Sequence, residues 1–121
     1  MSKKILVVED DSFLSGLEAK KLTMEGFEVS TAPDGETAVK LADQLKPDLI
    51  LLDLILPGMD GFGVLEKVRK NEALKNVPIL AFSNLSEEKD VAKAKELGAV
   101  DFMIKSNFTL DEVVAKVKEY I

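Results

Sequence analysis

The chain has 121 residues, of which 46% are hydrophobic, so it has the length of one ordinary domain and enough apolar surface for one packed core. Its 16 basic and 22 acidic residues give a net charge of −6, which argues against sequence-independent binding to nucleic acid and suits a cation or a basic protein partner. The absence of Cys and His excludes disulfides, thiolate chemistry and the usual general base, and no N-terminal stretch is apolar enough for a signal or membrane span, so we expect a cytoplasmic protein.

Strand-like and helix-like segments alternate along the whole chain. Short apolar runs predict strands at 4–8, 27–31, 48–53, 77–82 and 100–104, and the segments between them predict helices at about 12–25, 34–45, 61–70, 86–97 and 109–121. Thr109 and Glu112 form a capping-box pattern at the start of the last helix, and Gly26 and Gly98 stand where helices should end. This alternation predicts a single α/β domain over residues 1–121. We expect a doubly wound, five-stranded parallel sheet in the order 2-1-3-4-5, with five helices on its two faces.

Polar side chains follow four of these strands at the point where each apolar run ends. Glu9 and Asp10 follow the first strand, Asp53 the third, Ser83 the fourth and Lys105 the fifth. In open α/β sheets, ligands bind outside the carboxyl ends of the strands, so these groups should meet at one edge. Three carboxylates at that edge repel one another unless a cation lies among them.

The chemistry of these groups predicts a magnesium-dependent phosphoryl acceptor. Hard oxygen ligands without His or Cys select magnesium, manganese or calcium, and few ligands on separate strands favour magnesium, held by Glu9 and Asp10. Asp53 is the expected nucleophile, and Lys105 and Ser83 would hold phosphoryl oxygens. Taken singly, Ser83 reads as a turn serine and Lys105 as a solvated lysine. Asp11 or Ser12, by contrast, is interpreted only as a helix N-cap.

Four segments in order, ILVVEDD, DLILLDLILPGMDG, PILAFS and DFMIK, resemble the receiver domain of two-component response regulators, with similarity to chemotaxis regulators. The resemblance covers essentially the whole chain. It implies a flavodoxin-like fold and a phosphorelay switch rather than an enzyme that turns over substrate. It also implies magnesium-dependent phosphorylation of Asp53 by a histidine kinase, a phosphotransfer protein or a small phosphodonor.

The resemblance also implies roles for particular residues. Asp10, Asp53 and the backbone carbonyl of Ile55 would ligate the metal directly, with Glu9 acting through water. On phosphorylation Ser83 would turn toward the phosphoryl group and Phe102 would swing inward. These movements would reposition the face made by the fourth helix, fifth strand and fifth helix, where a downstream protein docks. A plain core role for Phe102 stays open.

The chain departs from the family pattern in three places. Phe102 has no hydroxyl where many relatives carry tyrosine, so an inward position of its ring would gain no hydrogen bond there. Ser106 stands where the family usually has a proline. A cis Lys105–Ser106 bond would cost about 3–4 kcal/mol, so a trans bond that places Lys105 differently is the cheaper alternative. Ile55 and Leu85 stand where the family tunes dephosphorylation, and because they cannot orient water we expect slow loss of the phosphoryl group.

Other functions on a similar scaffold can be weighed from the same residues. A haloacid-dehalogenase-type phosphatase needs a second aspartate where Ile55 stands, and a flavin domain needs a different loop after the first strand. A receiver-like interaction module that is not regulated by phosphorylation stays open as the alternative function.

Overall fold

The computed structural model describes residues 2–121 and contains every strand and helix that the sequence predicts, each with its ends within two residues of the prediction. The strands are β1 (Lys4–Val8), β2 (Glu28–Ala32), β3 (Leu49–Leu52), β4 (Ile79–Ser83) and β5 (Asp101–Ile104), and the helices are α1 (Ser12–Met24), α2 (Gly35–Leu45), α3 (Gly61–Lys70), α4 (Glu88–Glu96) and α5 (Leu110–Tyr120). Two short 3₁₀ helices, η1 (Glu72–Leu74) and η2 (Lys105–Asn107), were not predicted.

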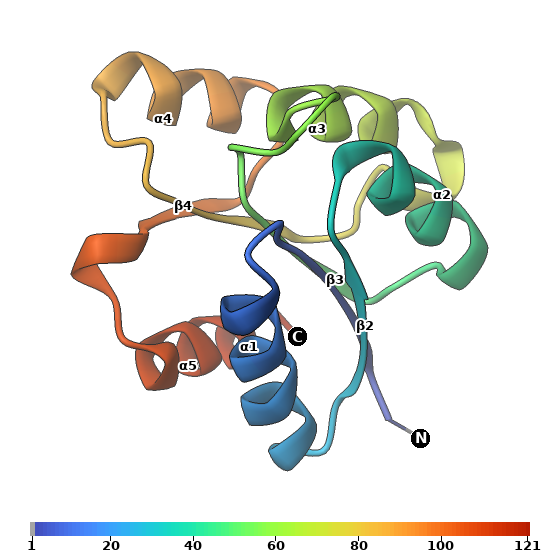
Figure 1. Ribbon diagram of the computed structural model, residues 1–121. Coiled ribbons are helices and arrows are strands. Elements are labelled where there is room, and N and C mark those ends of the chain that lie inside the picture. The colour runs from blue at the N-terminus through green and yellow to red at the C-terminus, as the bar shows by residue number, and fades with distance from the viewer. Residues whose placement is uncertain (1) are drawn as a thin grey trace.

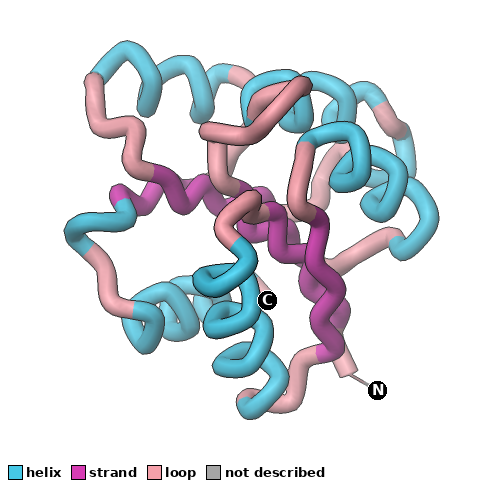
Figure 2. Tube along the Cα trace, in the orientation of Figure 1, coloured by secondary structure: helices cyan, strands magenta, loops and turns pink. Residues whose placement is uncertain are grey.

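The five strands form one parallel sheet in the order β2-β1-β3-β4-β5, as predicted from the alternation of strands and helices. Helices α1 and α5 cover one face of the sheet, and α2, α3 and α4 cover the other (Figure 1). The sheet is therefore the middle of three layers, and pink loops connect its strands to the helices on either side (Figure 2). None of the helices in the described part of the chain is long and apolar enough to cross a membrane.

Each face of the sheet buries its own apolar cluster. Alternate residues of β1 and β3 contribute to the two clusters, because successive side chains of a strand point to opposite faces: Leu6 and Ile50 pack under α2, α3 and α4, whereas Val7 and Leu51 pack under α1 and α5. Strands β3 and β4 are buried along their whole length, as expected for central strands of a sheet that is covered on both sides.

Helix ends lie where the sequence predicts them. Asp11 is the N-cap of α1 and accepts hydrogen bonds from the backbone N–H groups of Phe13 and Leu14, at 3.0 and 3.1 Å. Thr109 and Glu112 form both hydrogen bonds of a capping box at the start of α5. Gly98 follows α4 with a φ of +113°, a conformation that favours glycine. The described residues contain no cis peptide bond, so the Lys105–Ser106 bond is trans and the chain continues into η2.

Candidate functional site

The sheet register brings the first and third strand ends together. Val8 pairs with Leu52, and the backbone N–H of Asp53 donates to the carbonyl of Val8 at 3.0 Å. Glu9 is held on its other side, where its N–H donates to the carbonyl of Ala32 at 3.0 Å. Because both backbones continue the parallel ladder, Glu9 and Asp53 leave the sheet as neighbours.

The three predicted carboxylates converge at this edge of the sheet. Glu9, Asp10 and Asp53 each offer one oxygen, and these oxygens all lie within 4.8 Å of one another. Glu9 and Asp53 are buried, with 3% and 5% of their surface exposed, and Asp10 is exposed. The group, which we call the acidic pocket, is therefore open to solvent on one side.

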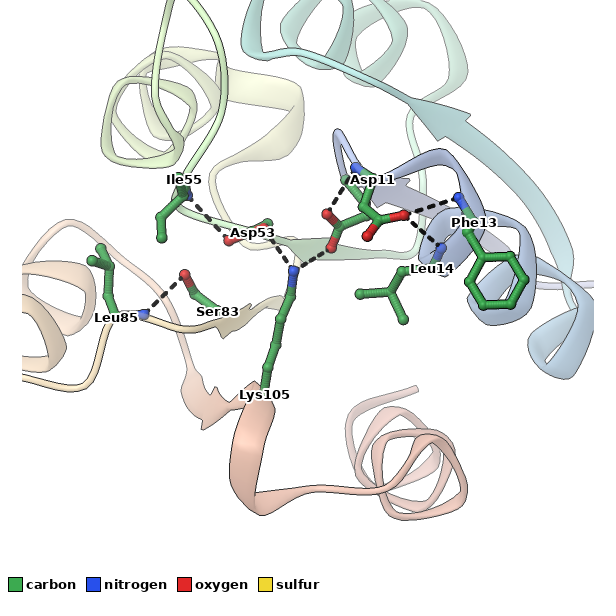
Figure 3. Close-up of polar contacts among 9 residues, drawn as sticks. Asp11, Phe13, Leu14, Asp53, Ile55, Ser83, Leu85 and Lys105 are labelled. Atoms are coloured by element: carbon green, nitrogen blue, oxygen red, sulfur yellow. Dashed lines mark hydrogen bonds and ion pairs between the residues drawn. The ribbon is translucent and has the colours of Figure 1, made fainter.

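Lys105 reaches into the acidic pocket although the peptide bond after it is trans. Its ammonium donates to Oε1 of Glu9 at 2.6 Å and to Oδ2 of Asp53 at 2.8 Å (Figure 3). The ammonium also lies 5.9 Å from the centre of the Phe82 ring, within range of a cation–π contact. The trans bond therefore leaves Lys105 close to Asp53, and in this state the ammonium bridges two of the carboxylates.

Burial and charge shift the pKa values of both bridged partners. Burial raises the pKa of Glu9, and the hydrogen bond from Lys105 offsets only part of that rise. Burial acts to lower the pKa of Lys105, but its hydrogen bonds to Asp53 and Glu9 outweigh burial, so the pKa is raised and the ammonium stays charged. Burial therefore favours the neutral form of Glu9 more than the hydrogen bond from Lys105 favours the charged form.

The predicted phosphoryl-binding serine lies beside this bridge. Ser83 is fully buried at the end of β4, and its Oγ accepts a hydrogen bond from the backbone N–H of Leu85 at 3.4 Å. Oδ1 of Asp53 accepts from the N–H of Ile55 at 3.1 Å, and the Ile55 side chain is half exposed. Figure 3 shows Ser83, Leu85 and Ile55 on the same side of Asp53. Apolar side chains thus flank that side, as the sequence analysis expects.

Phe102 lies away from this group, on β5. It is half-buried and packs against the apolar cluster beneath α3 and α4. This position is compatible with both a switching role and a plain core role, so the expectation of movement remains a prediction.

One titratable group near the pocket was missing from the sequence analysis. Glu18 is buried on the inward side of α1, where Ser15 and Leu22 are also buried. Its spacing of four residues from Leu14 and Leu22 would have placed it on the apolar stripe of that helix. A carboxyl on such a stripe was the signal that could have identified it.

The acidic pocket fits a divalent cation by the chemistry of its donors. Three carboxylate oxygens that lie within 4.8 Å of one another are hard ligands, Asp10 is accessible from solvent, and a single ammonium faces the three carboxylates. An acidic triad of this kind is typical of receiver domains.

The parallel sheet, its strand order and the acidic pocket together define a receiver-type signalling domain with a CheY-like flavodoxin fold. The family model for the response regulator receiver domain matches residues 5–118, and the chain belongs to this family. The family acts in two-component signal transduction, where its members are partners of histidine kinases, and it is not a classical enzyme family.

Similar proteins agree with this membership. The chain is 44% identical over 118 residues to the alkaline phosphatase synthesis transcriptional regulatory protein PhoP of Bacillus subtilis, covering 98% of this chain and 48% of PhoP. It is 38% identical over 115 residues to the DNA-binding dual master transcriptional regulator RpaA of Synechocystis, covering 95% of this chain and 47% of RpaA. The chain therefore spans about half the length of these regulators.

Solved structures agree as well. Chemotaxis protein CheY4 of Vibrio cholerae superposes with a TM-score of 0.93 at 26% identity, with both chains fully covered. The BeF3-activated N-terminal receiver domain of RstA from Klebsiella pneumoniae superposes with a TM-score of 0.88 at 30% identity, covering 98% of this chain and 97% of that one.

Proposed function

We propose that this chain is a phosphorelay switch that accepts a phosphoryl group on Asp53 in the presence of Mg²⁺. The observation that carries the proposal is the placement of Asp53, a buried carboxylate with a lysine ammonium at 2.8 Å and two further carboxylates close by. The contact with the ammonium fixes the position of the buried carboxylate, which can then attack phosphorus as a nucleophile. The neighbouring carboxylates supply ligands for a metal that neutralises charge.

The transfer step would run as follows. A carboxylate oxygen of Asp53 attacks phosphorus and forms a new O–P bond. The bond from phosphorus to the donor breaks, and its electron pair leaves with the donor, either the imidazole nitrogen of a phosphohistidine or the acetate of acetyl phosphate. Mg²⁺, when bound, neutralises negative charge that develops on the phosphoryl oxygens. Lys105, released from Glu9, donates to one phosphoryl oxygen, and the hydroxyl of Ser83 donates to another.

We expect Glu9, Asp10, Asp53 and the backbone carbonyl of Ile55 to hold the cation. The carboxylates suit Mg²⁺ because they are few and come from separate rigid strand ends, which leaves positions for water and for a phosphoryl oxygen. The phosphodonor would be a histidine kinase or a phosphotransfer protein.

The output would be a change in the face formed by α4, β5 and α5. Ser83 lies at the start of the loop that leads to α4, so its movement toward a phosphoryl group would shift that loop. Phe102 is half-buried on β5 beneath α4 and would fill space that the loop vacates. A local change in charge would in this way bias a packing arrangement on the docking face for a downstream protein.

The test is intact mass after incubation with acetyl phosphate, with and without Mg²⁺. We expect one Mg²⁺-dependent phosphoryl adduct on the wild type and none on Asp53→Asn. Asp11→Asn is the matched control because it changes a carboxylate beside the pocket, and asparagine is also a good N-cap, so it should be phosphorylated like the wild type.

The absence of an adduct on the wild type under every condition would refute the proposal and favour an interaction module that is not regulated by phosphorylation. The RstA receiver domain is described as BeF3-activated. We therefore expect BeF3 to change the chemical shifts of the wild type around Ser83 and Phe102 and to leave Asp53→Asn unchanged.

A further inference from the structure

Glu18 is a buried carboxyl that the proposed phosphoryl transfer does not use. Only 3% of its surface is exposed, and its Oε1 atom is fully buried with no hydrogen-bond partner among the described residues. An unpartnered carboxylate is strongly disfavoured in such a place, so the geometry indicates that Glu18 carries a proton.

Within residues 2–121, the immediate surroundings of Glu18 offer it no free cation. Beside it lies a narrow, mostly apolar space between α1, β3 and α5, lined by Leu22, Leu51, Leu110, Val113 and Val114. Lys21 also borders this space, but its ammonium is engaged with Asp111 at 2.7 Å and the side chain is 42% exposed. Lys105 is engaged with two other carboxylates.

Glu18 nevertheless lies within electrostatic range of the acidic pocket. Burial is the main reason that its pKa is raised, to about 8, and the negative charges of Glu9, Asp53 and Asp11 raise it further, whereas the charge of Lys105 lowers it. These are the charged groups that act on Glu18 from the ends of β1, β3 and β5. Among the described residues it has no hydrogen bond or ion pair to any of them, so the coupling acts through space.

We propose that Glu18 couples proton release to cation binding. It keeps its proton while Lys105 bridges Glu9 and Asp53, and it loses that proton to solvent when a divalent cation enters the acidic pocket. This inference rests on the proposed function only in that the pocket takes a divalent cation.

The direction follows from the charges. Two positive charges among Glu9, Asp10 and Asp53 favour a negative charge at Glu18, so the O–H bond of Glu18 breaks and the proton passes to water. By linkage, the ionised form of Glu18 in turn strengthens cation binding. The affinity should rise by about tenfold across the titration of Glu18 for each unit by which the cation lowers its pKa.

The test is calorimetric titration with Mg²⁺ at pH 6, 7.5 and 9, in pairs of buffers that differ in their heat of ionisation. This design reports affinity and the number of protons released together. Glu18→Gln mimics the protonated form at every pH. It should match the wild type at pH 6, bind Mg²⁺ more weakly than the wild type at pH 9, and lack the proton released near pH 7.5. Glu66→Gln, at an exposed position of α3, is the matched control and should behave like the wild type.

Each outcome separates this inference from the proposed function. If Glu18→Gln binds Mg²⁺ with the pH dependence and proton release of the wild type, the role of Glu18 is overturned and the metal site stands. If the wild type binds no Mg²⁺, both are overturned. A ¹³C NMR titration of the Glu18 carboxyl in the wild type needs no variant: its pKa should be near 8 without Mg²⁺ and lower at saturation, and an unchanged pKa would overturn the inference.

Discussion

Removing the ammonium of Lys105 should destabilise the protein strongly, and Mg²⁺ should restore much of the loss. The change is Lys105→Met, which keeps most of the apolar stem and deletes the charge. It leaves the buried carboxylates of Glu9 and Asp53, whose side chains are 2% and 5% exposed, facing each other without a cation. Their mutual repulsion and their loss of hydrogen bonds act in the same direction.

The contact distances set the scale of the effect. At an effective dielectric constant of about 20, opposite unit charges at 2.6–2.8 Å attract by about 6 kcal/mol. Much of this attraction is offset by the cost of taking the charges out of water, and the variant still bears that cost for both carboxylates. Removing one partner of a buried ion pair typically costs about 3–5 kcal/mol of folding stability, and we expect the free energy of unfolding to fall by an amount in this range at pH 7.

Urea unfolding, followed by circular dichroism with and without saturating Mg²⁺, measures this loss. Lys89→Met is the matched control, because Lys89 is 78% exposed and lies 3.3 Å from Glu87, and such exposed pairs contribute at most about 1 kcal/mol. The loss in Lys105→Met should shrink at pH 5, since the pKa of Glu9 is already raised and the carboxyl can take up a proton. A loss below about 1 kcal/mol at pH 7, or a loss that Mg²⁺ leaves unchanged, would refute the reasoning.

Three further predictions test other parts of the molecule. Gly98→Ala should lower the free energy of urea unfolding by at least about 2 kcal/mol, because φ is +113° and a Cβ would lie 2.5 Å from Nε of Arg69. Gly16→Ala, at a helix position with open space around it, should raise the free energy of unfolding by about 0.5–1 kcal/mol, and equal effects of the two substitutions would contradict this prediction. In the folded state Glu18 holds its proton up to about pH 8 instead of 4.5, so the free energy of unfolding of the wild type should fall as pH rises through that window. The free energy of unfolding of Glu18→Gln should match that of the wild type at pH 4.5 and exceed it by about 3–5 kcal/mol at pH 9, and parallel pH profiles of the two proteins would contradict this prediction. Phosphoryl loss from the wild type should be slow, because the apolar side chains of Ile55 and Leu85 cannot orient an attacking water. Ile55→Asn combined with Leu85→Glu should accelerate the loss in a mass-spectrometric decay assay, since the introduced amide and carboxylate can orient water, and an unchanged decay rate would count against this role of Ile55 and Leu85.

The architecture could be predicted because local signals and global topology agree. Each strand is a short apolar run, and each helix carries a cap or an amphipathic stripe, so the elements follow from these local signals. Once the order 2-1-3-4-5 is assumed, the strand ends place Glu9, Asp10, Asp53, Ser83 and Lys105 at one edge without any knowledge of side-chain conformation. The acidic pocket was therefore predictable as a group.

The contacts inside that group were not predictable in the same way. The sequence predicts that Lys105 binds a phosphoryl oxygen, whereas in the structure its ammonium donates hydrogen bonds to Glu9 and Asp53. Such pairing depends on the path of η2, and a three-residue 3₁₀ turn has no periodicity to detect. Glu18 was missed for a related reason. Its burial depends on the orientation of α1 about its own axis where the helix packs against α5, and this orientation cannot be read from the sequence. Glutamate, as a residue type, favours an exposed position.

The bridge made by Lys105 places stability and cation binding in competition. In the protein without a cation, the ammonium supplies the positive charge that Glu9 and Asp53 require, so it stabilises the fold. The same contact occupies the oxygens that a cation would use. Burial is the main reason that the pKa of Glu9 stays raised in spite of the lysine. Under the proposed function, a divalent cation would complete the neutralisation of three carboxylates that face a single ammonium. In the proposed switch, cation binding would release Lys105 beside Asp53, where its ammonium, now 5.9 Å from the centre of the Phe82 ring, would be available to an incoming phosphoryl group. Under this proposal the pocket binds a cation first, and Lys105 becomes available for a phosphoryl group only after that step.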